Sequence, residues 1–336
     1  MRVLPLGDIN DYSATYILVF LIGHLILGAV FKPRGVEKPL FYMMMEQAAR
    51  DVDRRLNREG RLPGELMARG VVAAGVMLAM SMLVGVAVSR IATHTYGFLA
   101  VFLFLGSCAS VMGSLHLLRK VAHLLSQGDT TKAAAALQPF CQDDLTPADA
   151  FTLARRALET SAVRLNRYFV APLLFFFFFR SEGVAFYVAC MAMHDAYGLG
   201  DKAHVMFAAP IRALERVVDF IPARLTGVFI AFAALFVSKG RNPFSTLALM
   251  IQQSAYYTPA NTGWLIAAEA GALGVTLGGA VRHNNETVER KWLGKEGDSA
   301  RLGAQDVVRA SLLHFVVFLL VFCVFIGVFV ASHNFS

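Results

Sequence analysis

The histidines and cysteines are the side chains of this sequence best suited to hold a metal ion or to act as nucleophiles. The nine histidines form no ligand pair at helical spacing, and the chain lacks Walker A, GxGxxG, HExxH and GxSxG patterns. The four cysteines are Cys108, Cys141, Cys190 and Cys323. They have no paired spacing, so no disulfide framework or zinc motif is implied. Residue types alone therefore identify no reaction.

The composition is that of an integral membrane protein. Of the 336 residues, 56% are hydrophobic and 16% are charged, against about 45–50% and about 25% in soluble domains. The net charge of +7 could indicate nucleic-acid binding. The basic residues flank apolar runs, however, so we expect no nucleic acid but a lipid bilayer with anionic head groups.

Long apolar runs predict the membrane helices. Those long enough to cross a hydrocarbon core of ~30 Å are Ala14–Phe31, Val71–Ser89, Phe98–Leu118 and Ser311–Ser332. Arg224–Val237 reaches that length only if Val217–Pro222 joins it. The sequence thus predicts an all-α, polytopic membrane protein with roughly 5–6 transmembrane helices. His24 lies inside the first run, either as a functional group or as a neutral histidine bonded to a neighbouring helix.

Two further apolar stretches have alternative interpretations. Tyr168–Tyr197 contains the phenylalanines of Phe175–Phe179, and Arg180–Gly183 interrupts it. Either one helix crosses with a polar kink, or two half-helices enter and return. Trp264–Gly279 is rich in glycine, which suits close helix packing or a re-entrant segment.

The distribution of lysine and arginine predicts the sidedness of the connections. Residues 32–70 and 119–167 are basic, whereas 90–96 carries a single basic residue. The positive-inside rule therefore places the first two connections in the cytoplasm and the N-terminus outside. The basic content of 239–310 favours the cytoplasm as well, and with it a crossing at Phe175–Phe179. We predict that residues 1–336 form a single membrane domain.

Two connections have helical patterns. In Leu40–Leu56, apolar residues recur every four positions with charged residues between them, which predicts an amphipathic helix. It lies either on the membrane surface or against its own protein. Thr146–Asp149 combines a capping residue, a proline and an acid, so a helix should start there and run toward Arg167.

Three stretches resemble a known family. They are DFIPARLT (Asp219–Thr226), NTGW (Asn261–Trp264) continuing through Ala270–Gly279, and FVAPL (Phe169–Leu173). In order and spacing they resemble the CbiB/CobD family of cobalamin biosynthesis over nearly the whole chain. The segment Arg167–Pro172 also resembles AmpE, an inner-membrane protein linked to β-lactamase induction, which lacks the glycine-rich stretch.

The resemblance implies an activity. The family consists of amide synthetases of the bacterial inner membrane. They join aminopropanol, or its O-phosphate, to adenosylcobyric acid and give adenosylcobinamide or its phosphate. A corrinoid and a small amino alcohol would be the substrates, and ATP with Mg²⁺ would activate the carboxylate. A homo-oligomer is compatible with this activity.

The resemblance also implies substrate-binding residues. Arg224, Asn261 and Trp264 keep residues of the family motifs. Arginine pairs with phosphate or carboxylate, asparagine with amides, and tryptophan could stack on the corrin. The alternative is that Arg224 and Trp264 anchor helix ends at the membrane interface.

The catalytic candidates follow in the same way. Glu159 matches a family glutamate that could hold magnesium or act as a base, or it is a solvated helix residue. Asp195 matches a family aspartate with a one-residue slip. In the family the motif tryptophan is followed by Pro-Glu, whereas here it is followed by Leu265 and Ile266. Glu269, one turn later, could substitute for that glutamate.

The sequence also departs from the family. Acidic and amide residues that the family has before Ala-Pro are replaced by Val163, Arg164 and Arg167. Arginines cannot bind magnesium. The chain therefore binds its nucleotide differently, or it is a non-catalytic membrane protein of the same fold, AmpE-like, with a sensing or partner-binding role.

Overall fold

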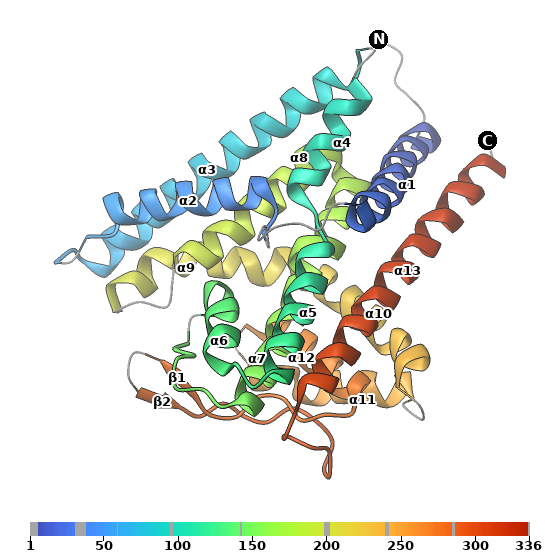
Figure 1. Cartoon of the computed structure of the whole chain (residues 1–336). Coiled ribbons are helices and arrows are strands. Elements are labelled where there is room, and N and C mark those ends of the chain that lie inside the picture. Colours follow the sequence, from blue (N-terminus) through green and yellow to red (C-terminus); the bar gives the residue numbers. More distant parts are fainter. Residues whose placement is uncertain are drawn as a thin grey trace. The chain divides into compact units, whose positions relative to one another are not determined.

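The computed structural model describes residues 6–30, 38–58, 60–94, 97–141, 143–197, 202–238, 242–257, 259–283 and 286–334. Most of this part is helical, which confirms the predicted all-α fold class (Figure 1). The strands of the described part form one short antiparallel hairpin, β1 (Val281–His283) and β2 (Glu286–Val288). The chain forms two compact units, and whether they make a single membrane domain stays a prediction.

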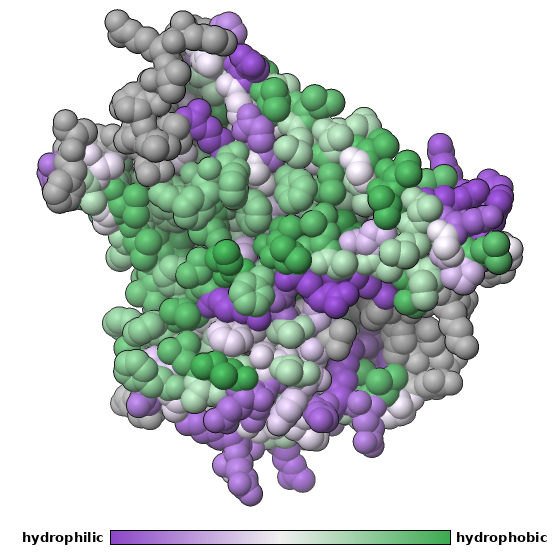
Figure 2. Space-filling model, turned by 180° about the vertical axis from the view of Figure 1, so that it is seen from behind, coloured by the Kyte–Doolittle hydropathy of each residue, from purple (hydrophilic) through white to green (hydrophobic). Residues whose placement is uncertain are grey.

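Within the described residues, five helical segments are long and apolar enough to cross a membrane. Three are single helices, Pro63–Ile91, Phe220–Val237 and Ala304–Ser332, and two are interrupted, Gly97–Ser126 and Ala150–Ala196. The apolar helix Ser13–Ile26, part of α1 (Leu6–Val30), is shorter. Large hydrophobic side chains lie exposed on these helices. Figure 2 shows hydrophobic residues in broad patches on the face that it draws. Such exposure is expected where a helix faces lipid.

The first unit is built around the long helix α3. The unit comprises Met1–Ser110, Arg167–Val218 and Phe322–Ser336. Its helices are α1, α2 (Leu40–Leu56), α3 (Pro63–Ile91), α4 (Gly97–Cys108), α8 (Ala171–Ala196) and α9 (Lys202–Val218). Helices α2, α8 and α9 pack against α3. A Cβ on Gly85 would lie 2.6 Å from the Cα of Glu182, so this contact between α3 and α8 requires a glycine.

Helix α2 has the bounds that the sequence predicts. Tyr42 and Ala49 on its inner face are fully buried, and α2 packs on α8. Leu40 and Met44 on its other face are more than half exposed. Of the two interpretations of this amphipathic helix, the structure shows packing against its own protein.

Helix α8 is a helical hairpin. Arg180 has φ 53° and ψ −148°, which breaks the helix after the phenylalanine run. The rings of Phe175 and Tyr187 stack with centroids 4.8 Å apart. On a straight helix, 12 positions correspond to a rise of ~18 Å. The two half-helices therefore fold back on each other, and our preference for a single crossing helix was wrong.

The second unit comprises Val111–Asn166 and Asp219–Val321. Its elements are α5 (Met112–Ser126), α6 (Thr130–Leu137), the 3₁₀ turn η1 (Gln138–Phe140), α7 (Ala150–Leu165), α10 (Phe220–Val237), α11 (Pro243–Gln253), the 3₁₀ turn η3 (Ser254–Tyr256), α12 (Ala260–Leu273), β1, β2 and most of α13 (Ala304–Asn334). Helices α7, α10 and α12 meet at a small apolar cluster formed by Ala162, Ala223 and Leu265.

Two predicted boundaries need correction. The run Phe98–Leu118 is not one helix, because α4 ends at Cys108 and α5 begins at Met112. Helix α7 is capped by Asp149, whose side chain accepts a hydrogen bond from the backbone N–H of Thr152, and not by Thr146. The side chain of Asp144 instead fixes a turn by accepting from the N–H of Thr146. A π-turn, η2 (Asn166–Val170), follows α7.

Candidate functional site

A buried network of charged side chains lies at the start of α7. Arg156 donates hydrogen bonds to Asp143 and to Glu159, and all three side chains are at least 90% buried. Arg290 donates to the second oxygen of Asp143 at 2.8 Å and lies 4.0 Å from Glu159. Two carboxylates and two guanidiniums thus neutralise one another, as buried charges must.

The glycine-rich stretch positions Glu159. The backbone N–H of Gly278 donates to Glu159 Oε1 at 2.8 Å. Gly278 has φ 101°, and a Cβ there would collide with the carbonyl oxygen of Lys291 and lie 2.9 Å from the Tyr257 hydroxyl. Only glycine fits such a site. Glu159 was predicted to be either a site residue or a solvated helix residue. Its side chain is 2% exposed, so the solvated alternative is wrong.

Tyr257 adds a protonated hydroxyl next to this network. Burial, and after it the nearby Glu159 carboxylate, raises the pKa of Tyr257 above its usual range. Its hydroxyl oxygen is buried and has no hydrogen-bond partner within the described part of the chain. The group therefore stays an O–H donor at neutral pH.

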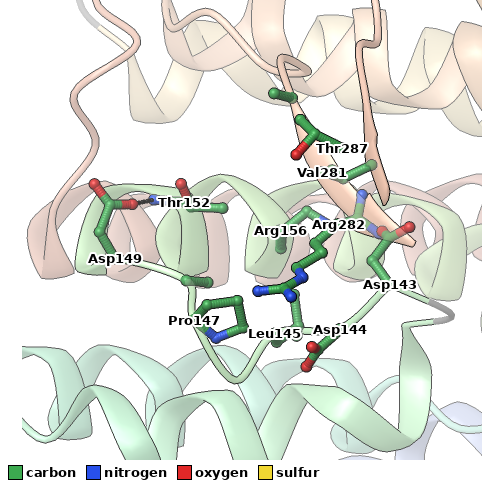
Figure 3. A pocket seen from close by; sticks show the side chains of 12 residues that line it. Asp143, Asp144, Leu145, Pro147, Asp149, Thr152, Arg156, Val281, Arg282 and Thr287 are labelled. Atoms are coloured by element: carbon green, nitrogen blue, oxygen red, sulfur yellow. Dashed lines mark hydrogen bonds and ion pairs between the residues drawn. The ribbon is translucent and has the colours of Figure 1, made fainter. Parts of the chain in front are cut away.

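A pocket of about 360 Å³ opens beside the network. Figure 3 shows that its lining comes from the loop before α7, the first turns of α7 and the β1–β2 hairpin. The polar lining residues are Asp143, Asp144, Asp149, Thr152, Arg156, Arg282 and Thr287. The pocket therefore combines carboxylates, guanidiniums and hydroxyls within one concave site.

Backbone hydrogen bonds hold the two walls of the pocket together. The N–H of Asp144 donates to the carbonyl of Arg282 at 2.8 Å, which joins the loop to β1. The side chain of Gln138 donates to the carbonyl of Asp143 at 2.8 Å and accepts from the N–H of Leu145 at 3.1 Å. The loop is thus fixed from both sides.

Arg224, Asn261 and Trp264, the substrate-binding candidates, lie together at the meeting point of α10 and α12. Arg224 donates to the side-chain oxygen of Asn261. Its guanidinium lies 3.7 Å from the ring centre of Phe220 and 5.1 Å from that of Trp264. The contacts bring the two most informative motif stretches into one place and leave Arg224 held by aromatic faces.

The same motif also contains a buried polar chain. Asn166 donates to Asp219 at 2.8 Å and accepts from the Thr226 hydroxyl at 2.8 Å. These side chains are buried. These hydrogen bonds join the end of α7 to the first turns of α10. They give Asp219 and Thr226, the first and last residues of the DFIPARLT stretch, a structural role.

Glu269 lies elsewhere on α12. Its side chain and that of His314 are fully buried, and Glu269 Oε2 lies 3.2 Å from His314 Nε2. The pair joins α12 to α13. The structure does not bring Glu269 to the pocket lining. Its Oε1 is buried and has no hydrogen-bond partner among the described residues, and its catalytic role stays a prediction.

Asp195 belongs to the first unit. It accepts hydrogen bonds from Arg167 and from the hydroxyl of Tyr42, and lies 3.2 Å from His194 Nδ1. Burial, and after it the Asp195 carboxylate, raises the pKa of Tyr42 well above its usual range. Asp195, in the last turn of α8, therefore forms an ion pair with Arg167, which precedes the helix.

The arginines that depart from the family pattern have internal contacts. Arg164 lies 3.8 Å from the ring centre of Phe140. Arg167 pairs with Asp195 and lies 3.9 Å from Glu215. The change from acidic to basic residues therefore produces packing and ion pairs inside the protein.

The side chains of the described residues form no evident magnesium site. They contain no group of three histidine, cysteine or carboxylate side chains that could hold a metal ion. Asp143 and Glu159 are both paired with arginine. We assign no step of a reaction to a metal held by these side chains.

Comparison with known proteins identifies the family. The family model described as CobD/Cbib protein matches residues 20–314. The chain belongs to the CobD/CbiB family. This confirms the resemblance inferred from the motifs.

Several CobD/CbiB proteins align with the chain at modest identity. The cobalamin biosynthesis protein CobD of Mycobacterium tuberculosis is 26% identical over 271 residues, which cover 81% of this chain and 83% of that protein. The Rhodobacter capsulatus protein of the same name is 29% identical over 194 residues, covering 58% of this chain and 59% of its own length. No solved structure matches the chain.

Sequence reasoning missed Asp143, Arg156, Arg290 and Tyr257. Asp143 and Arg290 are 147 positions apart, and no local spacing relates them. A partial signal existed for Arg156, since it lies one helical turn before Glu159 on α7. The rest of the network depends on tertiary structure.

Proposed function

We propose that this chain acts in cobalamin biosynthesis as an ATP-dependent amide synthetase of the bacterial inner membrane. It joins aminopropanol, or its O-phosphate, to a carboxylate of adenosylcobyric acid and gives adenosylcobinamide or its phosphate. Membership of the CobD/CbiB family supports the pathway. The relatives carry the name cobalamin biosynthesis protein CobD.

The observation that carries the proposal is the contact between Arg224 and Asn261. It unites the two motif stretches on which the family resemblance rests. Together with Trp264 and the half-exposed Phe220, it offers a guanidinium, an amide and aromatic faces. A corrinoid presents carboxylate, amide groups and a broad flat ring, so these groups suit it.

The chemistry also needs groups that hold a proton. An amine attacks only when it is unprotonated, so a base must take its proton. Glu159 and Asp143 are the buried carboxylates of the network beside the pocket. The backbone N–H of Gly278 holds Glu159, and Gly278 also lies close to the Tyr257 hydroxyl. Arg156 and Arg290 hold these carboxylates in place. ATP would activate the corrinoid carboxylate.

Complementation tests the proposal. The chain is expressed in a bacterium that lacks its own synthetase, and cobalamin-dependent growth on cobyric acid is scored. We expect growth with the wild-type chain and loss of growth with Arg224→Ala or Asn261→Ala at unchanged membrane levels. Arg54→Ala, an arginine with 72% of its side chain exposed, is the matched control that should grow.

As a control, the same strain is grown on cobinamide, the product of the proposed reaction. Growth there is expected, because it requires only the later steps of the host pathway. Absence of growth on cobyric acid with well-inserted wild-type protein would overturn the proposal. It would favour the second candidate, a non-catalytic, AmpE-like protein. The observation behind that candidate is the internal pairing of Arg164 and Arg167, where the family has acidic and amide groups.

A further inference from the structure

Helix α11 is too short to cross a membrane. It belongs to residues 239–310, which the sequence pattern treats as a basic connection outside the bilayer. Its 11 residues correspond to a length of ~16 Å, about half the thickness of a hydrocarbon core of ~30 Å. The side chain of Asn242 caps the helix by accepting from the N–H of Phe244, and Pro243 takes its first position. Local signals thus define where α11 begins.

One face of α11 is apolar and exposed. Phe244 and Ile251 are each 69% exposed, and Ala248 between them is exposed as well. The spacing of four and three positions places the three side chains in one stripe along the helix. The residues of α11 carry no charge. An uncharged stripe with a large aromatic and a large aliphatic side chain is typical of a surface that a partner covers.

The opposite face of α11 packs inside the second unit. Thr246, Leu249 and Met250 are buried, and α11 packs on α10 and α12. The contact with α12 is close, because a Cβ on Gly271 would lie 2.9 Å from Cγ2 of Thr246. The helix is therefore held from one side, and its apolar stripe points away from the core of the unit.

The neighbouring helix α10 exposes the same kind of surface. It is one of the segments that are long and apolar enough to cross a membrane. Leu235 and Phe236 in its last turn are both more than half exposed. Helix α11 follows α10 in the chain and packs against it. The exposed apolar surface thus continues from a membrane-spanning segment onto α11, so the lipid that covers the first is the occupant expected for the second.

An aromatic ring and a cation lie at the end of the stripe. Tyr256, in the turn η3 directly after α11, is exposed. The ammonium of Lys291 lies 4.8 Å from the centre of its ring. Tyrosine is enriched where the hydrocarbon core meets the head groups, and basic side chains there attract anionic lipids. This end of α11 therefore suits the level of the head groups.

We infer that α11 is an interfacial membrane helix. Its stripe of Phe244, Ala248 and Ile251 contacts the acyl chains of one leaflet, and Lys291 lies among the lipid phosphates. A helix with one apolar face binds a bilayer in this way, at the boundary of head groups and acyl chains. Part of residues 239–310 is then embedded in lipid. The inference does not depend on the proposed reaction.

Spin labels on the full chain test this position. The protein is reconstituted in vesicles of phosphatidylcholine and phosphatidylglycerol. A nitroxide is attached to Phe244→Cys or to Ile251→Cys in a Cys323→Ser background, since the other three cysteines are buried. Collisions of the label with oxygen, which concentrates in lipid, and with a water-soluble nickel complex are then measured. Both positions are exposed, so the labels leave the core intact.

Two further labels give the reference values. Val324→Cys reports lipid, because Val324 is exposed on the spanning helix α13, and Glu296→Cys reports water in the exposed loop before α13. We expect the labels in place of Phe244 and Ile251 to lose the nickel collisions seen at Glu296 and to match the oxygen collisions at Val324. Gln252→Cys, exposed beside the stripe, should give values between the two references.

Two results would overturn the inference. Nickel collisions in place of Phe244 and Ile251 as frequent as at Glu296 would show that the stripe faces water. Labels shielded from both reagents would show that protein covers the stripe. Magnetic broadening between labels, relieved by dilution with unlabelled chain, would then identify a second copy of this chain as the occupant.

Discussion

Arg167 and Asp195 form an ion pair that joins the two ends of the α8 hairpin. Arg167 precedes the first arm in η2, and Asp195 lies in the last turn of the second arm. The Tyr42 hydroxyl of α2 donates to the same aspartate. The hairpin is thus fixed at its base by one charge pair and one helix from outside.

Breaking this pair should destabilise the protein. The side chain of Arg167 is 8% exposed and that of Asp195 is 25% exposed. Asp195→Leu leaves the buried Arg167 guanidinium with the more distant Glu215 carboxylate, 3.9 Å away, at a cost of about 3 kcal/mol. Arg167→Leu combined with Asp195→Leu should recover part of this loss, because it removes the poorly paired guanidinium but leaves the buried Glu215 without its cation. Thermal unfolding of both variants in detergent checks the expectation, and a double variant less stable than either single one contradicts it.

The reversal at Arg180 predicts a stabilising substitution. A non-glycine residue at φ 53° and ψ −148° is strained by about 1–3 kcal/mol. Arg180→Gly should therefore raise the unfolding temperature. Arg180→Ala keeps the Cβ and should not, and this pair of variants separates strain from the loss of the exposed side chain. Equal unfolding temperatures for both would argue against strain at this position.

Gly278→Ala should impair the site more than an ordinary glycine substitution. The new Cβ collides with the carbonyl of Lys291 and displaces the N–H that holds Glu159. Gly297 is the matched control, because it has φ 90° but open space around it, so Gly297→Ala pays only the backbone cost of about 1 kcal/mol. Growth on cobyric acid should be lost with the first variant only. Normal growth with Gly278→Ala would show that this loop does not position Glu159 for the reaction.

Glu269 should be replaceable together with His314. The two side chains are fully buried and contact each other between α12 and α13. Glu269→Leu alone leaves a buried histidine without its partner and should reduce the amount of folded protein. Glu269→Leu with His314→Leu should restore both membrane level and growth, since an apolar pair can replace a buried polar one. Well-folded double variant that does not support growth would give Glu269 a role in the reaction.

The hydrophobic pattern of the sequence correctly predicted those helices that a local spacing or a long apolar run marks. The four-residue spacing of apolar positions predicted α2 with its correct ends, and the long runs predicted α3 and α13. The cap of α7 was misplaced because Thr146 and Asp149 are both good capping residues, and tertiary contacts of the loop decide between them.

The charge network was beyond the reach of sequence pattern. Asp143, Glu159 and Arg290 meet only after the glycine-rich loop has folded back on α7. The motif residues Arg224 and Asn261 were selected because a family resemblance marks them. The structure places them in contact, and their role in substrate binding stays a prediction. The resemblance did not indicate that Glu269 is enclosed by helices, since burial depends on neighbours from distant parts of the chain.

The reversal at Arg180 also changes the parity of the chain. A hairpin whose two ends meet at Arg167 and Asp195 contributes an even number of passages through any layer that its tip enters. The segments before and after it therefore leave on the same side. If crossings are counted from the N-terminus, every connection beyond residue 196 moves to the opposite side of the membrane. A crossing at Phe175–Phe179 therefore no longer supports a cytoplasmic position for residues 239–310. An odd number of passages elsewhere along the chain would have to return that basic connection to the side where its charges are favoured.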